Sequence, residues 1–342
     1  ALDPQVPATL TAELRDYQRD GYVWLMRLAH WGAGACLADD MGLGKTVQTL
    51  ALLLARAAAG PALVVAPTSV CLNWLAEANQ HAPTLNVRLY GPGDRAATLD
   101  ALGPYDLVIA SYGLLQLDVE RFAARRWASI VLDEAQAVKN RETRRARAVM
   151  RLSGDFRLIT TGTPVENHLG ELWNLFEFTN PGLLGSFEKF TERYALPIEK
   201  QGDPAARARL RKLIQPFVLR RNKSQVLAEL PPRTEISLRI ELSDEERTLY
   251  EALRLSALER LEGDAGTRRN LRILAEITRL RRACCHPSLI AADAGIAGAK
   301  LAAFAELVDE LLENRHKALV FSQFVDHLAI LRGHLDGRGV RY

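Results

Sequence analysis

Long apolar stretches are missing from this sequence, which limits the classes of protein it can encode. No run of about 18 apolar residues occurs, so no helix is expected to span a membrane and no membrane is expected among the partners. The first residues, ALDPQVPATL, have neither a charged start nor an apolar core, so no signal peptide is expected. Because they also lack an initial Met, we expect a processed chain or one excised from a longer protein.

Cysteine is scarce as well. The chain has 4 cysteines, and their spacing does not suggest a disulfide framework. Cys284 and Cys285 are adjacent and precede His286, which is not the C-x₂-C spacing of a zinc site. We therefore expect reduced, partly buried thiols in a cytosolic protein.

A strong net charge is also absent, since the formal value is +3. Arginine dominates the 44 basic residues, of which only 8 are lysine. Arginine suits bidentate contacts to phosphate, but a general bias toward arginine explains the bulk of these residues. Composition alone therefore does not indicate nucleic acid as a partner. The 342 residues, 48% of them hydrophobic, fit an ordinary globular protein with two domains.

What the sequence does contain is a glycine-rich turn in ACLADDMGLGKTVQTLALLL, residues 35–54. Ala35–Ala38 is expected to end a buried strand, and Thr46–Leu54 to form a helix. Between them, Gly42 and Gly44 permit backbone conformations that a Cβ would forbid. A tight turn there points several N–H groups at one place, beside the partial positive charge of a helix N-terminus. The turn is therefore predicted to bind phosphate.

The residues after the glycines fit a nucleotide. Lys45 can reach the β- and γ-phosphates, and the Thr46 hydroxyl can bind Mg²⁺. The strict P-loop pattern asks for Gly at the position where this chain has Asp39. The alternative interpretation is a strand–turn–helix corner whose glycines serve packing only.

An acidic motif, Asp133-Glu134-Ala135-Gln136, directly follows an apolar run. An acidic residue at a strand end beside a P-loop can hold the Mg²⁺ shared with the phosphates, which suits Asp133. Glu134 is then placed to polarise the attacking water. The alternative is an ordinary acidic loop at a strand end.

Apolar runs alternate with longer, helix-compatible stretches between Gly34 and Phe178. Continuous apolar runs fit strands buried on both faces, and strands that alternate with helices predict a parallel α/β sheet. Ligands of such sheets bind at the carboxyl ends of the strands, where both polar motifs lie. The predicted strands are Ala62–Ala66, Asp106–Ala110, Ser129–Leu132 and Arg157–Thr160.

The pattern changes after Pro181. From about 182 to 230 we expect helices and no strand, whereas TEISLRIEL at 234–242 alternates as a strand does. Ser243 and the acidic residues after it are a helix start signal. The remaining predictions are helices from 243 to about 290 with a break near 263–266, a loop at 291–299, a helix over Lys300–Glu313, a strand over Ala318–Phe321 and a helix to about Leu335.

Taken together, the motifs resemble the Swi/Snf-type family of double-stranded-DNA translocases, helicase-like ATPases of superfamily two with two RecA-like lobes. ADDMGLGKTVQT, VLDEAQAVKN and LITTGTPVENHLGELWNLFEF carry the resemblance, which extends along nearly the whole chain. In that family an acid stands where other P-loops have Gly, which accounts for Asp39. The resemblance implies a RecA-like P-loop NTPase lobe with a parallel sheet and helical insertions, followed by an incomplete second RecA-like lobe. The implied domains are 1–180 for lobe one, the helicase ATP-binding domain, 181–232 for its helical insertion, and 233–342 for the start of lobe two, with a helical insertion at about 243–295.

The resemblance also implies roles for the site residues. LRDYQRDGYVWL, residues 14–25, is similar to the adenine-recognition segment, in which Gln18 offers a donor and an acceptor together. The family more often has DEAH, so Gln136 departs from its pattern. The catalytic residues are then Lys45, Thr46, Asp133 and Glu134, with Thr46 and Asp133 as Mg²⁺ ligands. The nucleotide-binding residues are Gln18, Asp40, Met41, Gly42, Leu43, Gly44, Lys45, Thr46 and Gln136.

Two further segments, VVAPTSVCLNWLAE and VIASYGLL, resemble motifs that hold one DNA strand, and hydroxyls at helix starts suit phosphate oxygens. Trp74 is expected in the core, because a protein that tracks duplex DNA meets no unstacked base. TGTP at 161–164 would link the nucleotide site to the DNA groove, although a plain strand-to-helix turn also has such residues. The implied DNA-binding residues are Thr68, Ser69, Asn73, Ser111, Tyr112, Thr163 and Asn167.

Two basic segments leave alternatives open. The charges between Lys139 and Arg151 form either a solvated helix face or an edge that faces phosphates. Arg220–Lys223 resembles a family segment whose basic groups contact DNA or brace the lobes, and a solvated face fits equally. LRRACCHPSLI, residues 280–290, also resembles a family segment, which explains the paired cysteines without a metal.

The implied function is that of a DNA-dependent ATPase that uses ATP and Mg²⁺ and translocates along double-stranded DNA without separating its strands. A strand-separating helicase, a nucleotide-binding DNA-binding scaffold with little turnover, and a translocase acting on RNA polymerase or another DNA-bound protein are the alternatives. Such a protein works on the nucleoid in the cytoplasm or in the nucleus. The family carries its arginine fingers in later motifs that no segment here resembles, so slow hydrolysis by this chain alone is expected.

Overall fold

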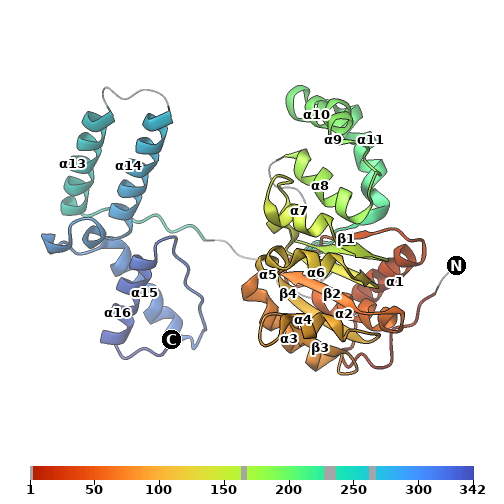
Figure 1. Cartoon of the computed structure of the whole chain (residues 1–342). Coiled ribbons are helices and arrows are strands. Elements are labelled where there is room, and N and C mark those ends of the chain that lie inside the picture. Colours follow the sequence, from red (N-terminus) through yellow and green to blue (C-terminus); the bar gives the residue numbers. More distant parts are fainter. Residues whose placement is uncertain (1–2, 163–167, 227–235, 262–266) are drawn as a thin grey trace. The chain divides into compact units, whose positions relative to one another are not determined.

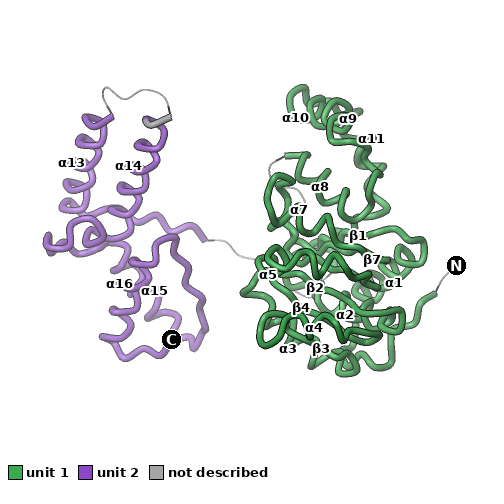
Figure 2. The backbone as a smooth tube through the Cα atoms, viewed as in Figure 1, with its two compact units in different colours: residues 1–232 green, residues 233–342 purple. Residues whose placement is uncertain are grey.

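The computed structural model describes residues 3–162, 168–226, 236–261 and 267–342 (Figure 1). It divides the chain into two units, which Figure 2 distinguishes by colour: unit 1 is Ala1–Pro232 and unit 2 is Arg233–Tyr342. Unit 1 contains both the glycine-rich turn and the acidic motif. The candidate site therefore lies within a single unit.

A seven-stranded parallel sheet forms the centre of unit 1. Its strands are β1 (Ala35–Leu37), β2 (Ala62–Ala66), β3 (Asn86–Leu89), β4 (Asp106–Ser111), β6 (Ser129–Asp133), β8 (Arg157–Thr160) and β9 (Val218–Leu219). Their order across the sheet is β3-β4-β2-β6-β8-β1-β9, and neighbouring strands run parallel. The predicted apolar strands are present, and the prediction of an α/β fold with a parallel sheet is confirmed. A separate parallel pair joins β5 (Arg126–Trp127) to β7 (Ser153–Gly154).

Two buried cores lie against the sheet, one on each face. Alternate residues of β2 enter different cores: Val64 packs in the first, and Leu63 and Val65 in the second. Burial on both faces therefore explains why the strands read as continuous apolar runs. The first core takes residues from α1 (Asp16–His30), α2 (Lys45–Arg56) and α3 (Thr68–His81). The second takes residues from α4 (Arg95–Asp100), α5 (Tyr112–Leu117), α6 (Val119–Ala123), α7 (Arg144–Met150) and α8 (Leu169–Thr179).

The segment after α8 contains mostly helices, but the prediction that it has no strand is wrong. Strand β9 pairs with β1, with Val218 opposite Cys36 and Leu219 opposite Leu37. A strand of two residues is too short to show alternation or a long apolar run, so no pattern marked it. The helices of this segment are α9 (Phe187–Phe190), α10 (Leu196–Gln201), α11 (Pro204–Ile214) and α12 (Lys223–Val226).

Unit 2 is helical in the part of it that the structure describes. The predicted helix start at Ser243 is present: Ser243 N donates to Glu246 Oε2 at 2.8 Å, and Glu246 N donates to Ser243 Oγ at 3.2 Å, which forms a capping box. The predicted break near 263–266 lies outside the described residues. The helices are α13 (Asp244–Leu261), α14 (Thr267–Cys285), α15 (Ala299–Glu313) and α16 (Val325–Gly337). None of the chain's described helices is both long and apolar enough to cross a membrane.

Two strands predicted in unit 2 are absent. Residues 236–242, the described part of the first, and residues 318–321 have no regular secondary structure. Their apolar side chains are exposed, with 77% for Ile236 and 87% for Phe321. A strand is stable only when a neighbouring strand satisfies its backbone, and unit 2 has no strand among its described residues.

Candidate active site

The glycine-rich turn joins the end of β1 to the start of α2. Gly42 has φ +85° and Gly44 has φ +74°, in the left-handed region that favours glycine. A Cβ at Gly44 would lie 2.3 Å from Gln18 Nε2, so no side chain fits there without displacing its neighbour. Since α2 begins at Lys45, its first N–H groups and its partial positive charge lie at the turn. This arrangement suits a bound phosphate.

The Lys45 ammonium lies over the same turn. Its Nζ donates to the carbonyl oxygens of Asp39 at 2.7 Å and of Asp40 at 3.3 Å. Both acceptors are backbone atoms of the turn, so the positive charge is kept where an anion would meet the α2 N-terminus. Met41 and Gly42 are exposed, whereas Leu43 is buried below the turn.

Gln18 and Tyr17, on the first turn of α1, also contact the glycine-rich turn. Gln18 Nε2 and Tyr17 Oη each donate to the Leu43 carbonyl oxygen, both at 3.2 Å. Gln18 Oε1 accepts from Arg15 N at 3.0 Å, so its amide uses both its donor and its acceptor. The segment predicted to recognise adenine therefore lies directly against the predicted phosphate loop.

Asp133 ends β6, and its carboxylate accepts from three donors, two of them on other elements, β8 and α3. Its Oδ1 accepts from Thr160 Oγ1 at 2.5 Å and from Glu134 N at 3.0 Å, and its Oδ2 accepts from Trp74 Nε1 at 2.7 Å. Trp74 is 1% exposed, as the prediction of a core residue required. Its indole also has a role that the sequence did not indicate, since it orients the carboxylate. Tyr112 Oη donates to the Asp133 carbonyl oxygen at 2.8 Å.

Glu134 has an unusual backbone and a polar partner on its side chain. Its φ of +47° and ψ of +53° lie in the left-handed region, which is uncommon for a residue with a side chain. Gln136 Nε2 donates to Glu134 Oε2 at 2.6 Å, and Gln136 Oε1 accepts from Thr161 Oγ1 at 3.1 Å. Gln136 thus connects the candidate base to Thr161, the first residue after β8.

Glu77 is a site residue that the sequence analysis missed. It lies on α3, three residues after Trp74 and thus on the same face of the helix. Burial raises the pKa of its carboxyl; the nearby Asp133 charge raises it further, and His81 and a hydrogen bond with the Thr46 hydroxyl oppose the rise. The i, i+3 spacing from a buried tryptophan was the available signal.

Asp39, in place of the usual glycine, is fully buried. Its carboxylate pairs with the Arg221 guanidinium, which follows β9 and is 182 residues away in the sequence. No local pattern could have predicted this pair. Asp40 contacts the same segment, because its Oδ2 accepts from Lys223 N at 3.1 Å.

The residues implied to bind DNA fall into three groups. Thr68, Ser69 and Asn73 are exposed near the N-terminus of α3, after the carboxyl end of β2. Ser111 is 7% exposed and caps α5 by accepting from Leu114 N at 3.2 Å, and the Tyr112 ring is buried. In this structure neither side chain is presented at the surface. Thr163 and Asn167 lie outside the described residues.

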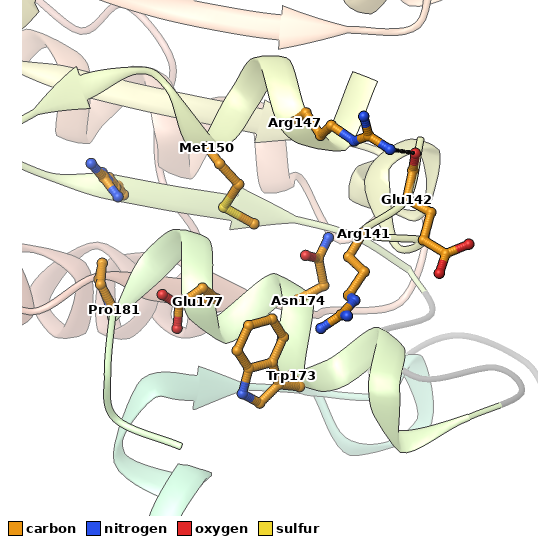
Figure 3. Close-up of a pocket in the computed structure, with 9 residues that line it drawn as sticks. Arg141, Glu142, Arg147, Met150, Trp173, Asn174, Glu177 and Pro181 are labelled. Carbon is orange, nitrogen blue, oxygen red and sulfur yellow. Dashed lines mark hydrogen bonds between the residues drawn. The ribbon is translucent and has the colours of Figure 1, made fainter. Parts of the chain in front are cut away.

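The basic segment between Lys139 and Arg151 mostly contacts protein groups. Lys139 pairs with Glu171 at 3.3 Å, Arg151 pairs with Glu120, and the Arg141 guanidinium lies 4.1 Å from the Phe187 ring centroid. Part of the segment borders a pocket of about 720 Å³ between α7 and α8, which Figure 3 shows. The pocket is lined by Arg141, Glu142, Arg147, Met150, Arg157, Trp173, Asn174, Glu177 and Pro181. None of these belongs to the glycine-rich turn or to the acidic motif, so the pocket is separate from the site described above.

Comparison of the sequence with known proteins finds a matching family and similar ATPases and helicases. A family model described as the SNF2-related domain matches residues 17–289. The chain is 40% identical over 336 residues to a putative ATP-dependent helicase/translocase, YwqA, of Bacillus subtilis, covering 94% of this chain and 36% of that protein. It is 34% identical over 356 residues to the ISWI chromatin-remodeling complex ATPase CHR17 of Arabidopsis thaliana, covering 98% of this chain and 33% of the relative. The chain thus spans about a third of the length of these relatives.

Solved structures give the same result for the fold. The SWI2/SNF2 ATPase core of Sulfolobus solfataricus in complex with dsDNA matches with a TM-score of 0.63 and 35% identity, over 97% of this chain and 72% of that one. The same core domain in a second structure matches with a TM-score of 0.61 and 34% identity, over 97% and 69%. The expected RecA-like fold is confirmed by these matches.

Proposed function

The chain belongs to the SNF2-related family, and on that premise we propose that it carries the ATP-binding lobe of a DNA-dependent ATPase that translocates along duplex DNA without separating its strands. The observation that carries the proposal is the connected site in unit 1. The glycine-rich turn follows the carboxyl end of β1, and Asp133 and Glu134 lie at the carboxyl end of β6, with β8 between these two strands. Parallel α/β sheets bind their ligands at this edge.

The residues present fit a nucleotide with Mg²⁺. The turn offers a helix N-terminus, two glycines with positive φ and the Lys45 ammonium. A carboxylate has about four acceptor positions. On the Asp133 carboxylate, described protein donors occupy three of these acceptor positions. The remaining position can contact a hydrated cation near Thr46. When bound, Mg²⁺ would offset the negative charge of the β- and γ-phosphate oxygens.

We assign the chemistry to residues of this chain as follows. Glu134 accepts a proton from the attacking water while the oxygen of that water bonds to the γ-phosphorus. The bond to the β–γ bridging oxygen breaks, and the products are ADP and phosphate. Gln136, which accepts from Thr161, holds the Glu134 carboxylate, while Trp74 and Thr160 hold that of Asp133. Lys45 stabilises the negative charge on the transferred group, and adenine recognition is assigned to the segment that contains Gln18.

We further propose that the exposed start of α3 contacts the DNA backbone. Thr68, Ser69 and Asn73 offer hydroxyl and amide donors, and such donors at a helix N-terminus suit phosphate oxygens. Contacts to phosphates carry no sequence information, which suits a protein that moves along DNA. The relative from Sulfolobus solfataricus was solved with double-stranded DNA, which supports duplex DNA as the partner. Such a protein would work on the nucleoid in the cytoplasm or in the nucleus.

The test is ATP hydrolysis by the full-length protein with duplex DNA, single-stranded DNA or no DNA. We expect duplex DNA to stimulate turnover most, and we expect no release of a labelled strand from a duplex. Strand release would favour a strand-separating helicase. Binding of ATP and DNA without turnover would favour a nucleotide-binding scaffold. A variant with Glu134→Gln serves as the control for hydrolysis by contaminants.

A further inference from the structure

The glycine-rich turn is bound along its first residues by a segment from the other end of unit 1. From the last residue of β9, the segment 219–223 continues beside residues 38–40. Ala38 N donates to the Leu219 carbonyl oxygen at 2.7 Å, and Asp40 N donates to the Arg221 carbonyl oxygen at 3.0 Å. Lys223 N then donates to Asp40 Oδ2 at 3.1 Å. The start of the turn is therefore backed by a second stretch of chain rather than by solvent.

Arg221 is the centre of this contact. Its Nε donates to Asp39 Oδ1 at 2.9 Å, its Nη2 donates to Asp39 Oδ2, and its backbone N donates to Asp39 Oδ1 at 3.1 Å. The Asp39 side chain is 0% exposed and that of Arg221 is 13% exposed. Such a buried bidentate pair has one geometry, because the planar guanidinium matches both carboxylate oxygens at once.

The same guanidinium reaches the other two parts of the candidate nucleotide site. Nη1 donates to the Tyr17 carbonyl oxygen, in the segment expected to recognise adenine, and the guanidinium lies 5.2 Å from the Tyr17 ring centroid. Nη2 also donates at 2.8 Å to Gln48 Oε1, on the first turn of α2. One side chain thus fixes the relative positions of the adenine segment, the turn and the helix that follows it.

We propose that Arg221 is a positioning residue of the nucleotide site and that segment 219–223 is a clamp whose closure on Asp39 sets the shape of the phosphate loop. This inference rests on the proposed nucleotide binding at that site. The described contacts of Arg221 are to protein groups, so its role would be to hold Asp39, Tyr17 and Gln48 where they are. Coupling between two sites is reciprocal. A clamp that raises nucleotide affinity must therefore be stabilised by the nucleotide to the same extent.

The first experiment measures ADP binding by calorimetry on the wild type, Arg221→Ala, Arg221→Lys and Arg220→Ala. Arg220 is the exposed neighbour in the sequence and serves as the matched control. We expect Arg221→Ala to weaken ADP binding about tenfold or more, Arg221→Lys to recover part of that loss, and Arg220→Ala to bind as the wild type does. A wild type that binds no ADP would contradict the proposed function. If the wild type binds and a folded Arg221→Ala binds equally well, the positioning role is refuted.

A merely structural role predicts a different result, in which Arg221→Ala melts at a lower temperature but binds ADP normally while folded. If Arg221→Ala does not fold, the double variant Asp39→Asn/Arg221→Met removes both buried charges and leaves neither unpaired. We expect this variant to fold and still to bind ADP about tenfold more weakly, whereas wild-type affinity would overturn the proposal.

Hydrogen exchange gives the reciprocal readout: ADP should slow exchange of the Arg221 and Lys223 amides in the wild type. Unchanged exchange at saturating ADP would contradict the clamp.

Discussion

Gln136 Nε2 donates a 2.6 Å hydrogen bond to Glu134 Oε2, and the other end of the same amide accepts from Thr161. One glutamine therefore links the residue proposed to take a proton from water to the first residue after β8. A glutamine serves this purpose because it offers a donor and an acceptor at once. Gln136, where the family more often has histidine, thus still connects Glu134 to Thr161 across the site.

Gln136 was expected among the nucleotide-binding residues, but its side chain bonds to Glu134 and Thr161, so Gln136→Ala should lower kcat and leave the affinity for ADP nearly unchanged. The carboxylate of Glu134 would lose the partner that orients it, while the glycine-rich turn would stay intact. The measurement is steady-state ATP hydrolysis by the full-length protein, beside an ADP titration. Weaker ADP binding with unchanged kcat would place Gln136 in binding instead.

Exchanging the proposed base by Glu134→Gln should keep ATP binding and lower turnover by roughly 10²–10⁴-fold, because an amide cannot accept the proton of the attacking water. Single-turnover hydrolysis measures this directly. Turnover at the wild-type rate would show that another residue orients and deprotonates the water.

The raised pKa of Glu77 predicts a pH dependence of stability. Its folded pKa lies above the ordinary value of 4.5, chiefly because of burial, so the unfolded chain loses this proton at lower pH than the folded protein does. The contribution of Glu77 to the free energy of unfolding therefore falls as pH rises from about 4.5 through the folded pKa. Glu77→Gln removes this fall.

The check for Glu77 is thermal unfolding of the wild type and Glu77→Gln between about pH 4 and pH 8. We expect the stability of the variant relative to the wild type to increase across the lower part of this range and then to level off. A constant difference at every pH would mean that the pKa of Glu77 is not raised in the folded protein.

The proposed phosphate contacts of α3 predict that DNA affinity falls steeply with salt and ignores sequence. Thr68→Ala and Asn73→Ala should each weaken duplex binding by a similar factor for unrelated sequences, with ATP binding unchanged. Fluorescence anisotropy at several salt concentrations provides the measurement. A strong preference for one duplex sequence at constant salt would contradict binding through phosphate contacts.

Much of unit 1 could be predicted because its signals are local. Residues 62–66 are a continuous apolar run, 157–160 have an apolar centre at Leu158 and Ile159, and both segments form strands with the predicted bounds. The glycines, Lys45 and Thr46 lie together in the sequence. The partners of these residues are not local. Trp74 reaches Asp133 across 59 residues, and Arg221 reaches Asp39 across 182, so only the folded chain shows them.

The wrong predictions of strands arose because a local sequence pattern does not show whether a neighbouring strand is present. Residues 236–242 and 318–321 alternate or are apolar as strands are, yet a strand forms only beside another strand, and unit 2 has none in its described part. Val218–Leu219 shows the reverse case: two residues with no pattern become β9 because β1 offers a free edge.

The central claim is that the turn between β1 and α2 binds the phosphates of a nucleotide, and the most direct test is an ADP titration of the wild type and Lys45→Ala by calorimetry in the presence of Mg²⁺. Because a hydrogen bond to a charged group contributes about 1.5–3 kcal/mol, the variant should bind ADP roughly ten- to a hundredfold more weakly. Circular dichroism should show that both proteins are folded, since Lys45 contacts only backbone oxygens of its own loop in the described structure. Equal binding by the two proteins, or no binding by either, would contradict the account.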